Sequence, residues 1–360
     1  MSNSLTPEQI IDIVAKHFII LEEISKSDIL IRLKVVPRVF GETSNSIREL
    51  YREIVPRGYH VLLREQDESF SLEIYRSDFK RASNKIFLVS LVITVATVFI
   101  TSYMWIASTV SLSQDIIFLR SIMLTLIILI PLAIHELGHY IVSRVYKIPS
   151  TIPIFIPGIP GITLGTFGAV IFARSLPPTL EELGLLAIAG PLGGVIFSII
   201  FAYYGLSISQ LVASMPQGAV SITTIPLIFI LLEEALFRGG SGSILLSPEA
   251  MAAYYLLLIH FINLLPVGQL DGGQVLRSFI SRRAHALVGL LTVVIFLILS
   301  VISRDIFIQT ITLFILLMYI LTGTYPHQGA SYDRRIMTKK SVIVFILWIT
   351  LLLLLTPIVV

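Results

Sequence analysis

The sequence predicts an all-α polytopic membrane protein with about seven transmembrane helices, preceded by a small α+β soluble domain at the N-terminus. The 360-residue chain is 55% hydrophobic and only 14% charged, which is too little charge to wet the surface of a soluble protein of this size. Apolar runs long enough to cross a bilayer recur from about residue 85 to the end. Residues 1–80 contain no such run and are rich in charged side chains.

The composition also limits the chemistry. The chain has no cysteine, which excludes disulfides and leaves His, Asp and Glu as ligands for any metal ion. The net charge of +3 comes from Lys and Arg residues dispersed at the ends of the apolar runs, so it does not indicate a nucleic-acid partner. The first residues lack the apolar segment of a signal peptide, and we expect none to be cleaved.

Residues 1–80 predict a domain of α-β-β-α-β-β order on the aqueous side of the membrane. Its elements are inferred from helix-capping residues, from alternation of apolar and charged side chains, and from amphipathic periodicity. They are a helix opened by Thr6-Pro7, a strand over Ile29–Val36, a helix over Thr43–Ile54, and a hairpin of His60–Arg64 with Phe70–Tyr75. We find no catalytic set of residues in this domain.

The apolar runs predict the positions of the spans. They lie near 85–107, 117–146, 183–205, 251–265, 285–303, 305–323 and 341–359. The membrane core therefore extends over 81–325, and 326–360 comprise a cytoplasmic loop and the last transmembrane helix.

Lys and Arg gather beside alternate ends of the spans, which orients the chain by the positive-inside rule. The N-terminal domain then lies in the cytoplasm and the C-terminus outside. This orientation requires that Ile225–Phe237, which is short for a span, lies at the interface or inserts only halfway. The basic groups are Lys80/Arg81/Lys85, Arg144/Lys147, Arg277/Arg282/Arg283 and Arg334/Arg335/Lys339/Lys340.

Two histidines lie four residues apart inside the second predicted span, in Ile134-His135-Glu136-Leu137-Gly138-His139. On a helix this spacing places both imidazoles on one face, where they can hold one Zn²⁺. Glu136 projects beside them and can accept a proton from water. Ionisable side chains are costly in a membrane span, so a metal site explains them better than a buried polar cluster between helices.

A third ligand is needed, because catalytic zinc sites have three protein ligands and an open position. Asp271 is the best candidate, since it follows an apolar run, falls on the cytoplasmic side and lies among glycines. A carboxylate at membrane depth needs a partner, which a divalent cation supplies. The alternative is that Asp271 caps a helix that begins after Gly273.

These segments resemble the site-2 protease family of intramembrane zinc metalloproteases. The resemblance covers roughly 80–325, and its soluble first domain is most similar to the plastid-and-prokaryote branch. Gly165–Ile171 is similar to the membrane-inserted β-hairpin of the family, and Ala189–Gly194 to the start of the helix after it. The motifs that carry the resemblance are His135-Glu136-Leu137-Gly138-His139 in one span, with Asn263-Leu264-Leu265-Pro266 and Leu270-Asp271-Gly272-Gly273 in a later one.

The resemblance implies one Zn²⁺ per chain, held by His135, His139 and Asp271. Glu136 is then the general base, and Asn263 holds the scissile carbonyl or positions the substrate. The implied substrates are single-span proteins of the lipid bilayer, cut inside their membrane helices in regulated intramembrane proteolysis. The soluble domain gates the site or binds the soluble part of a substrate, and the sequence does not indicate an oligomeric state.

A substrate helix must unwind before its peptide bonds are accessible. The free edge of the segment around Gly165–Ile171 can add an unwound substrate as a strand. The alternative is a short connecting hairpin with a Gly-rich turn. The strand residues concerned are Gly165, Phe167, Gly168, Ala169 and Val170.

Rival interpretations remain. Glu233-Glu234 with Arg238 resembles the signature of the CAAX-type membrane endopeptidases, but the partner histidine motifs of that family do not fit around His260. His260 either lines the cavity or packs between helices. A non-catalytic membrane scaffold or metal transporter using the same ligands is the alternative of another class, and a transporter would show ionisable residues along a path through several spans.

Overall fold

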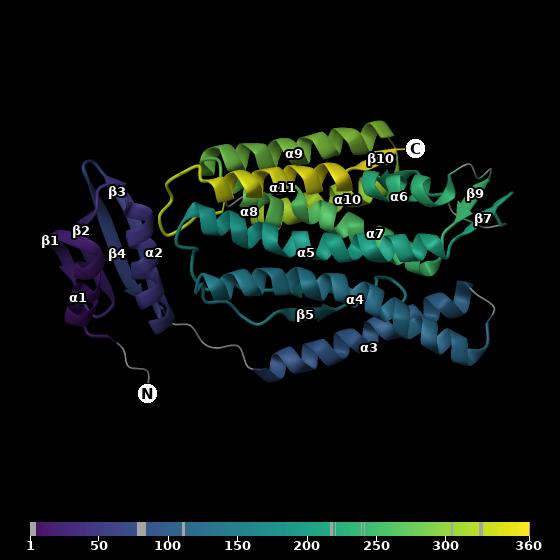
Figure 1. Ribbon diagram of the computed structural model, residues 1–360, viewed down its shortest axis with the longest axis horizontal. Helices are drawn as coiled ribbons and strands as arrows, with labels where there is room; N and C mark the ends of the chain where they lie inside the picture. The colour runs from purple at the N-terminus through teal and green to yellow at the C-terminus, as the bar shows by residue number, and fades with distance from the viewer. Residues whose placement is uncertain are drawn as a thin grey trace.

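The computed structural model describes residues 5–77, 84–109, 112–216, 219, 221–238, 240, 242–303, 305–323 and 327–359. A small domain made of the N-terminal residues lies at one end of an elongated molecule, and a bundle of long helices forms the remainder (Figure 1). The predicted domain boundary at residue 80 and the basic pair Lys80 and Arg81 lie outside the described residues.

The α-β-β-α-β-β order predicted for the N-terminal domain is confirmed. Its four strands form one antiparallel sheet in the order β1-β2-β4-β3. Helix α1 begins with a capping box in which Thr6 and Gln9 satisfy each other's backbone N–H groups. The elements are α1 Pro7–His17, β1 Phe18–Lys26, β2 Leu30–Pro37, α2 Thr43–Ile54, the 3₁₀ turn η1 Val55–Arg57, β3 Tyr59–Gln66 and β4 Ser69–Arg76.

A helix lies at each of the seven positions where a span is predicted, but these helices differ in length. Within the described residues, four of them are long and apolar enough to cross a membrane: α3, α4, α5 and α9. Helices α7, α10 and α11 have only 17, 13 and 17 residues. The bounds are α3 Asn84–Thr109, α4 Gln114–Val145, α5 Leu180–Ser207, α6 Leu227–Phe237, α7 Pro248–Leu264, α8 Asp271–Arg277, α9 Arg282–Ser303, α10 Ile306–Met318, the π turn η2 Tyr319–Gly323 and α11 Lys339–Leu355.

In the part of the chain that the structure describes, three short two-stranded sheets lie between the helices. The sequence-based prediction that the last span extends to residue 359 is wrong. Helix α11 ends at Leu355, because Pro357 lacks the N–H that a continuing helix needs. The next residues pair with β8, just before the 11-residue helix α6. The strands are β5 Ile154–Pro157 with β6 Thr166–Val170, β7 Gln210–Val212 with β9 Ser243–Leu245, and β8 Thr224–Pro226 with β10 Pro357–Val359.

Helix α5 forms the centre of the bundle and packs against α4, α7, α8 and α11 (Figure 1). Helices α3 and α4 lie on one side of α5, and α9, α10 and α11 on the other. An ion pair inside the bundle joins α4 to α7, where Arg120 contacts both oxygens of Glu249 at 2.7 Å. Glu249 is almost fully buried, so this charge is compensated rather than solvated.

Side chains of the N-terminal domain dock it onto the membrane core. Arg48 of α2 donates to Glu182 at 2.6 Å and to Glu181 at 3.1 Å, both in the first turn of α5. The outer edge of β3 is covered, because the N–H of Leu63 donates to the carbonyl of Ser331 at 2.8 Å. The N–H of Ser331 in turn donates to the carbonyl of Pro177. The loop before α11 therefore lies between the two parts of the chain.

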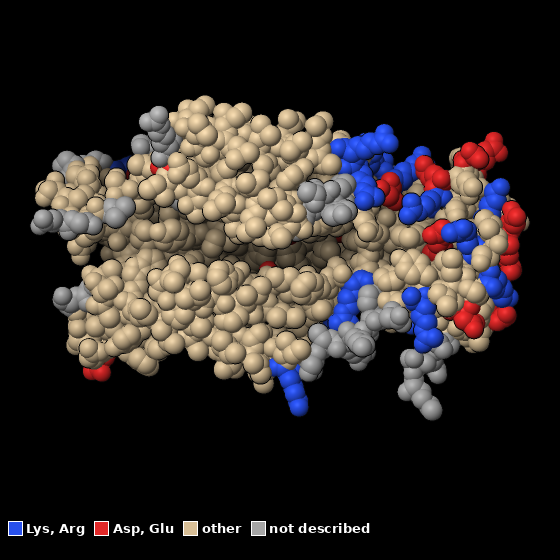
Figure 2. Space-filling model, turned by 180° about the vertical axis from the view of Figure 1, so that it is seen from behind, with Lys and Arg blue, Asp and Glu red and all other residues tan. Residues whose placement is uncertain are grey.

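Charge and apolar surface separate along the molecule. Lys and Arg gather at the end that carries the N-terminal domain, together with most of the visible acidic residues (Figure 2). The rest of this face is almost entirely uncharged, and a long groove runs along it with acidic atoms visible at its floor.

Candidate metal centre

Three side chains from two distant parts of the chain converge inside the bundle. His135 and His139 come from α4, and Asp271 is the first residue of α8. Among the described residues they form the one group of three metal-ligating side chains, and His135 and Asp271 are buried. The Nε2 atoms of the histidines are 3.2 Å apart, and Oδ2 of Asp271 lies 3.1 Å from Nε2 of His135 and 3.4 Å from Nε2 of His139.

These separations match a tetrahedral metal ion. Ligand bonds of about 2.0–2.1 Å to zinc separate neighbouring ligand atoms by roughly 3.3–3.4 Å. Two imidazole nitrogens and one carboxylate oxygen also form a donor set typical of catalytic zinc. The three atoms therefore fit three corners of a zinc tetrahedron.

The tautomer of His139 is fixed by a hydrogen bond on its other nitrogen. Nδ1 lies 2.7 Å from the carbonyl oxygen of Leu186 on α5, and a carbonyl can only accept. Nδ1 must therefore carry a proton, so that in the neutral ring the lone pair is on Nε2, the atom that faces Asp271. Such an orienting bond on the second ring nitrogen is usual for histidines that ligate metals.

Glycines on α5 create the space that the histidines occupy. A Cβ atom on Gly190 would lie 2.2 Å from Nε2 of His139, and one on Gly194 would lie 2.4 Å from Cε1 of His260. In the opposite direction, a Cβ on Gly138 would lie 2.3 Å from the carbonyl oxygen of Ala189. Helices α4 and α5 can thus approach closely only because these positions lack side chains.

Asp271 is held by the turn between α7 and α8. Helix α8 begins at Asp271 and its N-cap is Leu270, so the alternative that Asp271 caps a helix beginning after Gly273 is wrong. Asn263, near the end of α7, donates from Nδ2 to Oδ2 of Asp271 at 2.7 Å. A Cβ on Gly272 would lie 1.8 Å from the carbonyl oxygen of Leu264, so the turn can form only with glycine at this position.

Glu136 and His260 complete the surroundings of the three ligands. Glu136 is 9% exposed and forms no hydrogen bond or ion pair with another described residue. The ring of His260 lies parallel to that of His135, with centroids 5.2 Å apart and 13° between the planes. Neither ring nitrogen of His260 has a hydrogen-bond partner within the described part of the chain. The sequence leaves open whether His260 lines the cavity or packs between helices. In the structure His260 is buried and lies beside the group of candidate ligands.

Most of the segment predicted as a substrate-binding strand forms β6, which pairs antiparallel with β5, and Gly165 directly precedes this strand. Within the described residues β5 is its only strand partner. Gly165 has a φ of +82° and packs on α3, where its carbonyl accepts a 2.7 Å hydrogen bond from Thr97. Phe167 is exposed, and Ala169 and Val170 pair with Phe155 and Ile154.

The acidic pair of the rival motif lies elsewhere. Glu233 and Glu234 belong to the short helix α6 and are not members of the ligand group. Among the described residues they form no ion pair, including with Arg238.

The comparisons with known proteins agree with this geometry. Residues 123–302, half of the chain, match peptidase family M50. This segment contains both histidines, Glu136, Asn263 and Asp271. No solved structure matches the chain.

Curated relatives match over a similar region. The chain is 30% identical over 175 residues to the probable zinc metalloprotease EGY1, chloroplastic, of Oryza sativa subsp. japonica, covering 44% of this chain and 28% of the relative. The protein of the same description in Arabidopsis thaliana is also 30% identical, over a match that covers 45% of this chain and 30% of the relative. The probable zinc metalloprotease EGY2, chloroplastic, of Arabidopsis thaliana is 31% identical, over a match that covers 42% of this chain and 27% of the relative. Each match spans less than a third of the relative.

The fold and the site define an integral membrane protein with a buried group of two histidines and one aspartate that could hold a metal ion. The chain belongs to peptidase family M50.

Proposed function

We propose that this protein is an intramembrane zinc metalloprotease that hydrolyses peptide bonds within the transmembrane segments of other membrane proteins. The observation that carries the proposal is the convergence of His135, His139 and Asp271 inside an apolar bundle, with Glu136 beside them. Family membership and the printed descriptions of the relatives support the same activity.

His135, His139 and Asp271 would hold the zinc ion. When bound, the ion polarises the scissile carbonyl and acidifies a water molecule. Glu136 accepts a proton from the attacking water and returns it to the amine that leaves, which balances the hydrolysis without another acid or base. Its carboxylate is available because it has no other partner among the described residues.

Asn263 acts on this site in one of two ways. Its hydrogen bond to Asp271 supports a role in fixing the ligand carboxylate. Its Nδ2 atom also lies 3.3 Å from Nε2 of His135, close enough to the ligand group to contact a substrate carbonyl there. Both roles require the amide at this position.

The substrates we propose are single-span membrane proteins, which would enter from the bilayer through the long groove on the uncharged face (Figure 2). An unwound stretch of substrate can pair with the edge of β6 that β5 leaves open within the described chain. Residues 165–170 would supply the backbone groups for this strand.

The membrane arrangement that we propose has seven spans, with α7, α10 and α11 crossing beside the four long helices. Short helices can cross where the bilayer thins or where neighbouring helices cover their ends. The basic residues at the end that carries the N-terminal domain support a cytoplasmic location for this domain (Figure 2). Proteolysis would then release a cytoplasmic fragment of the substrate.

The test is cleavage by the purified, detergent-solubilised protein of a panel of single-span substrates, before and after removal of zinc with 1,10-phenanthroline. We expect cleavage inside the substrate helix, its loss on chelation, and its return when zinc is added. Bound zinc without cleavage of any substrate would contradict the proposal and support the scaffold or transporter alternative. Cleavage that continues after zinc is removed would support the rival site at Glu233 and Glu234.

A further inference from the structure

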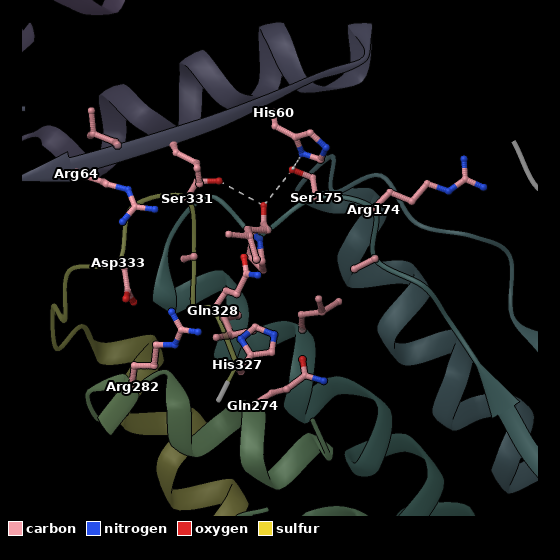
Figure 3. Close-up of a pocket in the computed structure, with 18 of the residues that line it drawn as sticks. His60, Arg64, Arg174, Ser175, Gln274, Arg282, His327, Gln328, Ser331 and Asp333 are labelled. Atoms are coloured by element: carbon pink, nitrogen blue, oxygen red, sulfur yellow. Dashed lines mark hydrogen bonds between the residues drawn. The ribbon is translucent and has the colours of Figure 1, made fainter. Parts of the chain in front are cut away.

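A cavity lies between the N-terminal domain and the membrane core. It has a volume of about 800 Å³ and is lined from above by β3 and β4 and from below by the starts of α5, α8 and α9 (Figure 3). The loop before α11, which contributes Ser331 and Asp333, forms one wall. This size is typical of sites that bind a small ligand or a short peptide.

The charge of this cavity is positive. Three arginines line it: Arg64, Arg174 and Arg282. Asp333 is the one acidic side chain among the described lining residues, and Arg277 already pairs with it at 2.5 Å. Arg64 and Arg282 are exposed to the cavity and form no ion pair with a described residue. Figure 3 shows both on the same side, Arg64 from β3 and Arg282 from α9.

The uncharged groups of the wall also favour an acceptor-rich ligand. Burial lowers the pKa of His60, and burial with the charge of Arg277 lowers the pKa of His327 to about 4, so both imidazoles are neutral at pH 7. Nδ1 of His327 accepts a hydrogen bond from the N–H of Gly329, which leaves Nε2–H as a donor. Arg282 is the first residue of α9, where the helix dipole itself attracts anions.

The cavity adjoins the metal centre. Leu186 lines it, and the carbonyl of the same residue accepts the hydrogen bond from His139. Gln269 and Gln274 of the wall stand on either side of Asp271 in the sequence. A polypeptide that leaves the metal centre toward the N-terminal domain therefore meets this cavity within a few residues.

We propose that the cavity binds an acidic polypeptide segment, namely the stretch of a substrate that directly adjoins its transmembrane helix on the side of the N-terminal domain. The carboxylates of the segment would pair with Arg64 and Arg282. Because Arg64 belongs to the N-terminal domain and Arg282 to the membrane core, a segment bound to both would stabilise the docked position of the domain. The identification of this segment as part of a substrate rests on the proposed proteolysis. The binding of an acidic peptide in the cavity does not depend on that activity.

Binding is therefore measured first, without cleavage. A fluorescein-labelled peptide rich in Asp and Glu, and a neutral peptide of the same length, are titrated with the purified full chain by anisotropy. We expect saturable binding of the acidic peptide alone, weakened at least tenfold in the Arg64→Ala/Arg282→Ala double variant and at high ionic strength. Arg52→Ala is the matched control, because Arg52 is an exposed arginine of the same domain that does not line the cavity. Inorganic pyrophosphate is the competitor.

Equal affinity for the neutral peptide, or unchanged binding of the acidic peptide by the double variant, would overturn the proposal. Binding of pyrophosphate without binding of the acidic peptide would also overturn it, because the cavity would then be a site for small anions. Each variant is checked for a monodisperse size-exclusion peak and full zinc content. Failure of proteolysis with peptide binding intact would reject the protease but retain the site that binds acidic segments.

The cleavage arm uses single-span substrates whose flanking residues are acidic, neutral or basic. The double variant should raise the KM for the acidic substrate about tenfold and leave its kcat close to that of the wild type. Arg64→Glu/Arg282→Glu should reverse the preference toward the basic flank, a change that a loss of folding cannot produce. Equal KM values for all three flanks in the wild type would contradict the proposal.

Discussion

Gly190 of α5 lies so close to the imidazole of His139 that a Cβ atom there would be 2.2 Å from Nε2. Nε2 is the atom that we propose as the zinc ligand, and an added methyl group must displace the ring or separate the helices. We predict that Gly190→Ala lowers zinc content by at least half and lowers proteolysis in proportion. Metal analysis of the purified variant measures this effect.

A matched control separates this effect from a general intolerance of alanine. Gly289 of α9 has no neighbour closer than 3.7 Å to the position of a Cβ, so Gly289→Ala should retain full zinc and activity. Normal zinc content in Gly190→Ala would contradict the close packing of α4 and α5 at the metal centre.

Asn263 holds Asp271 by a 2.7 Å hydrogen bond. Groups that orient a metal ligand typically contribute about tenfold to hundredfold to metal affinity. We predict that Asn263→Ala weakens zinc binding by about tenfold, measured by competition with a chromogenic chelator. Unchanged zinc affinity with a lower kcat would instead assign Asn263 to the substrate carbonyl.

Arg48 compensates two carboxylates in the first turn of α5, and the side chain of Glu182 is only 1% exposed. Removing one partner of a buried ion pair costs about 3 kcal/mol. We predict that Arg48→Ala lowers the apparent Tm and increases hydrogen exchange in α2 and β3, while the exposed Arg52→Ala changes neither. Unaltered exchange in Arg48→Ala would show that this ion pair does not hold the N-terminal domain in place.

The loop before α11 should make stability depend on pH through His327. Burial first, and then the charges of Arg277 and His285, lower its pKa to about 4 from 6.5. Between these values the unfolded chain binds more protons than the native protein, so stability is complete above about pH 6.5 and falls as the pH decreases toward 4.

The variant that tests this dependence is His327→Gln, which cannot titrate. Its apparent Tm should decrease less than that of the wild type between pH 7 and pH 5. Because both proteins share every other titrating group, the difference between them isolates His327. An equal decrease in the two proteins would contradict the pKa assignment.

The sequence predicts the ligands but not the packing that creates their site. The i, i+4 spacing of His135 and His139 defines their common face on any helix, and Asp271 stands out because a carboxylate at membrane depth needs a cation. Nothing in a local pattern shows that Gly190 and Gly194 face those rings, because this depends on how α4 and α5 cross. The stacking of His260 on His135 depends on α7 in the same way.

The order of elements in the N-terminal domain also follows from local patterns, whereas its docking does not. Alternation and capping residues identify strands and helices one at a time. The hydrogen bond from Leu63 to Ser331 joins residues far apart in the sequence, as does the ion pair of Arg48 with Glu182. The apolar run that continues to residue 359 also predicts too long a last helix, because the residues after Leu355 pair as β10 with β8.

The most direct test of the central claim is Glu136→Gln, with proteolysis and bound zinc measured on the same sample. The substitution keeps the size of the side chain but replaces the carboxylate with a neutral amide that cannot act as a base. General acid–base groups contribute about 10²–10⁴-fold to rates. We predict that cleavage of a single-span substrate falls by at least a hundredfold while one zinc ion per chain is retained. Cleavage at the wild-type rate with zinc bound would contradict the assignment of Glu136 as the base.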